Sequence, residues 1–93
     1  MTIQKSKILI IGGGAIGLLL ALVLQAKQST DIMIIDTNKK RLDVCKQAAR
    51  WNIAHPDDSE VLDNHYDIVF DAVGFATTRQ KSIQTIQQGG VII

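Results

Sequence analysis

The sequence predicts an α/β fold, a parallel sheet with strand order 3-2-1-4-5 and helices on both faces. Two observations support this prediction. Segments of strand length alternate with segments of helix length along all 93 residues, which is typical of repeated strand-helix-strand units. The strand segments are mostly continuous apolar runs, as in strands buried on both faces of a parallel sheet. We therefore expect right-handed crossover connections between the strands.

The first half of the chain predicts two strands and two helices. Residues 7–11 are a β-favouring apolar run that ends at Gly12, and residues 15–26 have the Leu- and Ala-rich composition of a helix packed against a sheet. Residues 32–35 are a second buried strand. Turn and cap residues follow it: Asp36, Thr37 and Asn38. The next helix has its apolar positions at helical spacing: Leu42, Cys45, Ala48 and Ala49.

The second half is less regular. Residues 52–54 predict a short third strand, followed by a loop around Pro56 and one helical turn near residues 59–62. Residues 66–71 predict the fourth strand. The last predicted helix covers residues 78–88, with two isoleucines, Ile83 and Ile86, facing the sheet. A glycine pair, Gly89 and Gly90, then ends the helix before a fifth strand that begins at residue 91.

Composition and charge exclude several classes of protein. The net charge of +1 does not indicate a nucleic-acid or anionic-membrane partner. The apolar stretch of residues 8–24 is divided by three glycines into a strand and a helix, each too short to cross a bilayer. The single cysteine, Cys45, cannot form an internal disulfide, and no secretory signal is recognisable, so we expect a cytoplasmic location.

The chemistry-bearing motif is G-x-G-x-x-G, placed between a predicted strand and a predicted helix. Gly12 permits the tight turn, Gly14 allows the backbone to approach a pyrophosphate, and Gly17 allows close packing of the helix on the strand. The helix N-terminus would then bind the phosphates through its free amides and its dipole. The motif is the dinucleotide-binding fingerprint of the Rossmann fold.

Asp36 lies about twenty residues beyond the motif, at the end of the second predicted strand. A carboxylate there accepts hydrogen bonds from the adenosine ribose and repels a 2′-phosphate, which favours NAD over NADP. The basic run of residues 39–41 is opposing evidence, because it could neutralise such a phosphate. A structural alternative is that the glycines only form a turn and that Asp36 only caps the next helix.

Several motifs in this order resemble the cofactor domain of the zinc-type medium-chain alcohol and polyol dehydrogenases. They are the strand leading into the glycine loop, Asp36 followed by Arg41, the fourth strand with its Ala72-Val73-Gly74 ending, and the entry to the fifth strand. The resemblance implies that Arg41 packs beside the adenosine ribose and that Ala72, Val73 and Gly74 approach the cofactor. The complete set of candidate cofactor-binding residues is Gly12, Gly13, Gly14, Ala15, Ile16, Gly17, Asp36, Thr37, Arg41, Ala72, Val73 and Gly74.

The resemblance also implies what the chain lacks. In that family the fold continues through a sixth strand, and a separate domain binds zinc and substrate. Residues 1–93 are therefore expected to be a dinucleotide-binding domain cut within its fifth strand, with no catalytic residue and no turnover of its own. Its open sheet edge would favour self-association.

Other chemistries find less support. Cys45, His55 and His65 are possible zinc ligands, but the cysteine lies on the apolar helix stripe and the histidines in loops, so we assign no metal site. No serine lies in a nucleophile-elbow motif. Two alternatives share the glycine loop. One is a regulatory module that senses NAD or a nucleotide in potassium transport, and the other is the FAD-binding half of a flavoprotein.

Overall fold

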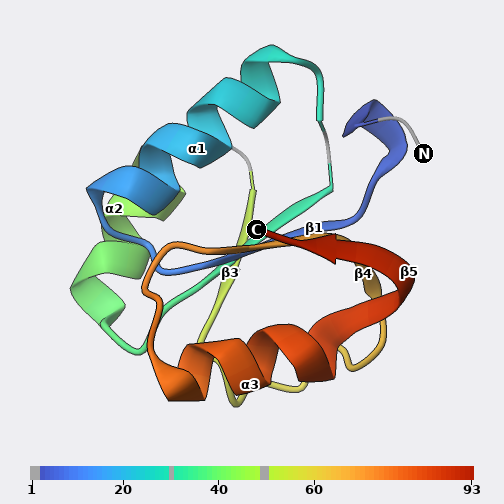
Figure 1. Ribbon diagram of the computed structural model, residues 1–93. Helices are drawn as coiled ribbons and strands as arrows, with labels where there is room; N and C mark the ends of the chain where they lie inside the picture. The colour runs from blue at the N-terminus through green and yellow to red at the C-terminus, as the bar shows by residue number, and fades with distance from the viewer. Residues whose placement is uncertain (1–2, 30, 49–50) are drawn as a thin grey trace.

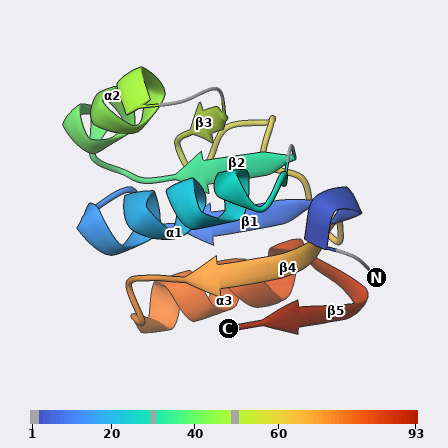
Figure 2. The same ribbon diagram turned by 90° about the horizontal axis from the view of Figure 1, so that it is seen from above.

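The structure, a computed structural model, describes residues 3–29, 31–48 and 51–93. Five strands in these residues form one parallel sheet in the order β3-β2-β1-β4-β5, which confirms the predicted topology. Figure 2 shows the strands side by side, with β3 and β5 at the two edges. Their bounds are Ile8–Ile11 for β1, Ile32–Ile35 for β2, Asn52–Ala54 for β3, Tyr66–Asp71 for β4 and Ile86–Ile92 for β5.

Helices cover both faces of this sheet. Their bounds are Ala15–Ala26 for α1, Lys39–Ala48 for α2 and Ala76–Thr85 for α3, and a short 3-10 helix, Ile3–Lys5, precedes the first strand. The helices α1 and α2 lie on one face, and α3 lies on the other (Figure 1). No helix in the described ranges is long and apolar enough to span a membrane.

Two apolar cores result from the alternation of side chains along the strands. In β1, Ile8 and Ile10 join the core beneath α1 and α2, whereas Leu9 and Ile11 join the core beneath α3. All four are buried, as expected for a central strand with a sheet neighbour on either side and helices above and below. The short β1 is thereby held rigidly, and the loop that follows it begins from a fixed point.

The helix α1 coincides with the prediction, and its C-terminus shows why it stops. The amide of Lys27 bonds back to the carbonyls of Val23 and Leu24. Gln28 then takes a left-handed conformation with φ of 68°, and the amide of Ser29 returns to Leu24. This arrangement satisfies the last helical carbonyls, although the left-handed position is one that usually favours glycine.

The prediction for the last helix is wrong in its bounds and in its buried face. The helix starts earlier because the amide of Phe75 donates to the hydroxyl of Thr78, and it ends three residues before position 88. Ile83 is exposed, and the buried positions are Ser82 and Thr85. Both hydroxyls bond to carbonyls of the preceding helical turn, which removes the cost of burying them.

The end of the chain differs accordingly. Ile86 is the first residue of β5, beside Tyr66, and packs against the core beneath α3. Gly89 and Gly90 lie within the strand rather than at a helix end, at a register irregularity between β4 and β5. The segment 59–62 forms turns instead of a helical turn, with its one apolar anchor, Val61, buried.

Candidate functional site

The carboxyl ends of three neighbouring strands meet at one edge of the sheet. Ile11 pairs with Ile35 of β2 and with Asp71 of β4, so these strands end level with one another. Hydrogen bonds extend the alignment beyond the strands, from the amide of Gly12 to the carbonyl of Ile35 and from the amide of Ala72 to that of Ile11. This edge lies where the strand order reverses, the position at which open α/β sheets bind ligands.

The glycine loop between β1 and α1 requires glycine at two positions for different reasons. Gly12 has φ of +108°, which side chains rarely adopt, and a Cβ there would lie 2.9 Å from Val73. A Cβ on Gly17 would lie 1.8 Å from the carbonyl oxygen of Gly12, so α1 could not sit this close to the loop. Both roles agree with the sequence interpretation.

Gly14 has a different environment. A Cβ built on Gly14 would meet nothing within 4 Å, so the space beside it is open. Gly14 is the N-cap of α1, and the first amides of a helix have no partner within the helix. The loop therefore presents helix-N-terminal amides beside open space, an arrangement that suits a phosphate or pyrophosphate group.

Asp36 holds the loop and the second strand together. Its side chain is buried and accepts hydrogen bonds of 2.8 Å from the amide of Gly13 at Oδ2 and from the amide of Asn38 at Oδ1. The guanidinium of Arg41 lies 3.7 Å from the same Oδ2. Asn38, rather than Asp36, caps α2, because its side-chain oxygen accepts from the amides of Lys40 and Arg41. The carboxylate thus braces the glycine loop.

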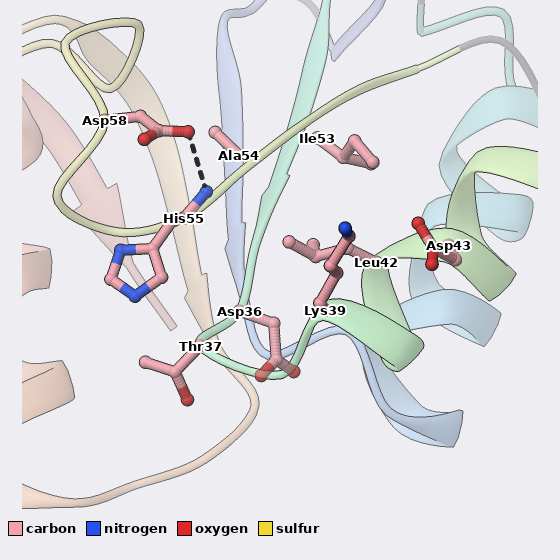
Figure 3. Close-up of a pocket in the computed structure, with 9 residues that line it drawn as sticks. All are labelled: Asp36, Thr37, Lys39, Leu42, Asp43, Ile53, Ala54, His55 and Asp58. Atoms are coloured by element: carbon pink, nitrogen blue, oxygen red, sulfur yellow. Dashed lines mark hydrogen bonds between the residues drawn. The ribbon is translucent and has the colours of Figure 1, made fainter.

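Two neighbouring cavities open at this edge. The first, of about 270 Å³, follows the loop and is lined by Gly12, Gly14, Ala15, Ile16, Gly17, Arg41, Ala72 and Val73. The second, of about 350 Å³, lies beyond the ends of β2 and β3 (Figure 3) and is lined by Asp36, Thr37, Lys39, Leu42, Asp43, Ile53, Ala54, His55 and Asp58. Because Asp36 lines one and its ion-pair partner Arg41 lines the other, the two cavities adjoin.

The structure thus brings together ten of the twelve candidate residues along these cavities. Gly13 does not line either cavity. A Cβ built on it would point toward Cys45 and Asp36. Gly74 lines neither cavity. It is exposed, with φ of +80°, and Arg79 donates to its carbonyl.

Sequence reasoning missed two residues that organise the site. Asp71 accepts hydrogen bonds from the amides of Val73 and Gly74 and from the hydroxyl of Thr78, which shapes the loop after β4. Its signal was an aspartate at a strand end with glycine three residues later, a usual setting for an Asx turn. The sequence predicts for Cys45 only a place on the apolar stripe of the second helix, yet its thiol also donates to the carbonyl of Gly13. The lining of the second cavity by His55 and Asp58 carried no recognisable signal.

The possible zinc ligands do not come together. Across the described ranges, no group of three His, Cys, Asp or Glu side chains is placed to hold a metal ion. Cys45 is fully buried in the core beneath α1 and α2, whereas His55 lies in the loop after β3 and bonds to the amide of Asp57.

A glycine loop at a helix N-terminus, an acidic residue at the end of β2 and this strand order define a nucleotide-binding Rossmann domain. The chain belongs to the family described as NADP oxidoreductase, coenzyme F420-dependent, whose model matches residues 7–93. A comparison with curated protein sequences gave no significant match.

Solved dehydrogenase and reductase structures share the fold. L-Idonate 5-dehydrogenase from Escherichia coli superposes with a TM-score of 0.86 at 20% identity, over 97% of this chain and 28% of its own. 2R,3R-Butanediol dehydrogenase from Bacillus subtilis superposes with a TM-score of 0.78 at 26% identity, over 95% of this chain and 28% of its own. Acetophenone reductase from Geotrichum candidum, solved in complex with NAD, superposes with a TM-score of 0.83 at 21% identity, over 96% of this chain and 26% of its own. The resemblance to the cofactor domain of these dehydrogenases is confirmed, and the chain spans only about a quarter of their length.

Proposed function

We propose that this chain binds the adenosine and pyrophosphate parts of NAD, as the cofactor-binding domain of an alcohol or polyol dehydrogenase. The observation that carries the proposal is the geometry of the glycine loop. Its N-cap, Gly14, borders open space at the start of α1, and Asp36 stands at the next strand end. Phosphates would lie against the α1 amides, and the adenosine ribose would lie beside Asp36 in the second cavity.

The preference for NAD rests on charge. The Asp36 carboxylate would accept hydrogen bonds from the ribose hydroxyls and would repel a 2′-phosphate placed there. Its two present hydrogen bonds come from amides of the chain, and a carboxylate has further acceptor sites for a ligand. Arg41, already 3.7 Å from Asp36, is partly neutralised by it.

NADP is the second candidate, favoured by the description of the family that the chain belongs to. Lys39 and Lys40 are exposed at the start of α2, near the second cavity, and could pair with a 2′-phosphate if Arg41 turned away from Asp36. The regulatory and flavoprotein alternatives gain no such support, because the similar solved structures named above are dehydrogenases and a reductase.

In the whole protein, the proposed reaction is hydride transfer between an alcohol or polyol and the nicotinamide ring. The residues named here would hold the adenosine end, and groups outside residues 1–93 would hold the nicotinamide, the substrate and any zinc. We propose that residues 1–93 alone bind NAD without turning over substrate.

The experiment is calorimetric titration of the chain with NAD, NADP and ADP-ribose, repeated on Asp36→Ala. We expect NAD and ADP-ribose to bind with similar affinity, NADP to bind more weakly, and the variant to lose affinity for the first two. Asp63→Ala is the control, because Asp63 is an exposed carboxylate away from both cavities. Tighter binding of NADP than of NAD would favour the second candidate, and binding of none of the three would overturn the proposal.

We also propose that the free edge of β5 pairs with β5 of a second copy. Among the residues that the structure describes, the strand has a sheet neighbour on one side only, and its last residues, Val91 and Ile92, are exposed and apolar. Sedimentation velocity on the chain and on Val91→Lys tests this, since a charge at the edge should shift the population toward monomer. An unchanged distribution would exclude the edge as the contact.

A further inference from the structure

The peptide groups of Gly13 are held by side chains from two different elements. Its amide donates to Oδ2 of Asp36 at 2.8 Å, and its carbonyl accepts from Sγ of Cys45 at 3.4 Å. Asp36 follows β2, whereas Cys45 lies in the middle of α2. The centre of the glycine loop is therefore clamped between a carboxylate and a thiol, both far from it in sequence.

The thiol is well placed to remain a donor. Burial, and secondarily the charge of Asp36, raise the pKa of Cys45, so that the S–H group stays protonated at neutral pH. The contact is also tight, since a Cβ on Gly13 would lie 3.3 Å from the sulfur. A buried S–H···O bond is weak, but the Cys45 side chain is fully buried, so solvent does not reach it.

Cys45 is itself fixed in place. Its carbonyl accepts a hydrogen bond of 2.9 Å from the indole nitrogen of Trp51, and both side chains belong to the core beneath α1 and α2. Trp51 precedes β3, so α2, β3 and the glycine loop are linked through one residue. A shift of α2 would move the sulfur and release the Gly13 carbonyl.

We propose that Cys45 is a positioning residue for the nucleotide site, acting through the Gly13 carbonyl to fix the glycine loop and the first amides of α1. The step from loop geometry to affinity rests on the proposed function. Asp36 orients the Gly12–Gly13 peptide through its N–H group, and Cys45 orients the Gly13–Gly14 peptide through its carbonyl group. With both contacts present, the loop is preorganised, which lowers the free-energy cost of ordering it on binding.

The test separates the S–H donor from the space that it fills. Cys45→Ala removes both, Cys45→Val removes the donor while filling the space, and Cys45→Ser keeps a donor. Val61→Ala is the control for general loss of stability, since Val61 is buried in the other core and lines neither cavity. Each variant is measured by amide hydrogen exchange of Gly13 in the free protein and by titration with NAD and ADP-ribose.

We expect exchange of the Gly13 amide to rise about fivefold in Cys45→Ala and Cys45→Val, and the dissociation constants to rise about threefold to tenfold. Cys45→Ser should restore both values toward wild type, and Val61→Ala should change neither beyond its effect on global unfolding. The inference is overturned if Gly13 exchange in the Ala and Val variants equals that of wild type, or if Ser behaves like Ala. If wild type binds neither ligand, the proposed function fails, and the exchange data still decide whether the clamp exists.

Discussion

Gly17 lies directly against the carbonyl of Gly12, so closely that a Cβ on Gly17 would sit 1.8 Å from that oxygen. This contact fixes where α1 leaves the glycine loop, because neither backbone segment can retreat without separating the helix from β1. It also divides the glycines of the motif into those that the fold requires and those that a ligand would require.

Gly17→Ala should therefore be strongly destabilising, by more than about 3 kcal/mol, or should prevent folding. Gly14→Ala introduces the same methyl group at φ of −75° with nothing within 4 Å, so we expect a loss of less than about 1 kcal/mol. Urea unfolding followed by circular dichroism measures both. Under the proposed function, Gly14→Ala should stay folded yet bind NAD at least tenfold more weakly, and undiminished binding would contradict that use of the loop.

Stability should decline at alkaline pH. Burial raises the pKa of Cys45, with a further rise from Asp36, and burial likewise raises the pKa of Tyr66 despite an opposing backbone hydrogen bond from Leu62. Both groups are neutral when protonated, so the folded state holds these protons more tightly than the unfolded state does. The free energy of unfolding should not change with pH below the unfolded-state pKa values, about 8.5 for Cys45 and about 10 for Tyr66. It should fall as pH rises past each of them.

Urea midpoints at pH 7, 9 and 10.5 test this expectation. Cys45→Ser and Tyr66→Phe each remove one of the two titrating groups, so each variant should show a shallower decline than wild type. A midpoint that stays constant up to pH 10.5 would contradict the expectation.

The left-handed residue at the end of α1 offers a stabilising change. Gln28 has φ of 68° and is exposed, so Gln28→Gly should raise the free energy of unfolding by about 0.5–1 kcal/mol. The matched control is Gln25→Gly, an exposed position within the helix, where glycine should cost about 0.5–1 kcal/mol. Thermal unfolding distinguishes the two, and a loss of stability in Gln28→Gly would show that its side chain contributes more than its strained backbone costs.

The loop after β4 should depend on one carboxylate. Asp71→Ala removes the acceptor for the amides of Val73 and Gly74 and for the hydroxyl of Thr78, so we expect a loss of about 1.5–3 kcal/mol. Asp63→Ala, which removes an exposed acceptor for Gln84, should cost less than about 0.5 kcal/mol. Equal effects in urea unfolding would indicate that the Asp71 network contributes no more than a surface contact.

The sequence predicted the strand order and nearly all strand bounds because the apolar runs are continuous and the glycine motif anchors the order of elements. The prediction failed at α3, where helical spacing of apolar residues places Ile83 on the face toward the sheet. The helix instead buries Ser82 and Thr85, whose hydroxyls bond to its own backbone, and leaves Ile83 in solvent. Competition between helix and sheet for Ile86 is a tertiary effect that local periodicity does not encode.

The candidate site was predictable to a similar extent. The glycine spacing and Asp36 can be recognised in the sequence, because each meets a requirement of the local backbone. The thiol of Cys45 does not, since its contact with Gly13 joins positions that only the folded sheet brings together. Asp71 is intermediate, because its Asx turn is local while its bond to Thr78 is not.

The position of β1 has a consequence for how the chain reaches its native state. Of the strands in the described residues, β1 is synthesised first, yet it occupies the centre of the sheet, where Ile8 pairs with Ile32 on one side and with Ile68 on the other. One edge of this apolar strand therefore stays unpaired until β4 has been synthesised. During that interval the nascent chain exposes an apolar strand edge that is prone to aggregation. We expect the yield of folded protein to depend on translation speed and on holdase chaperones more strongly than the stability of the folded state would suggest.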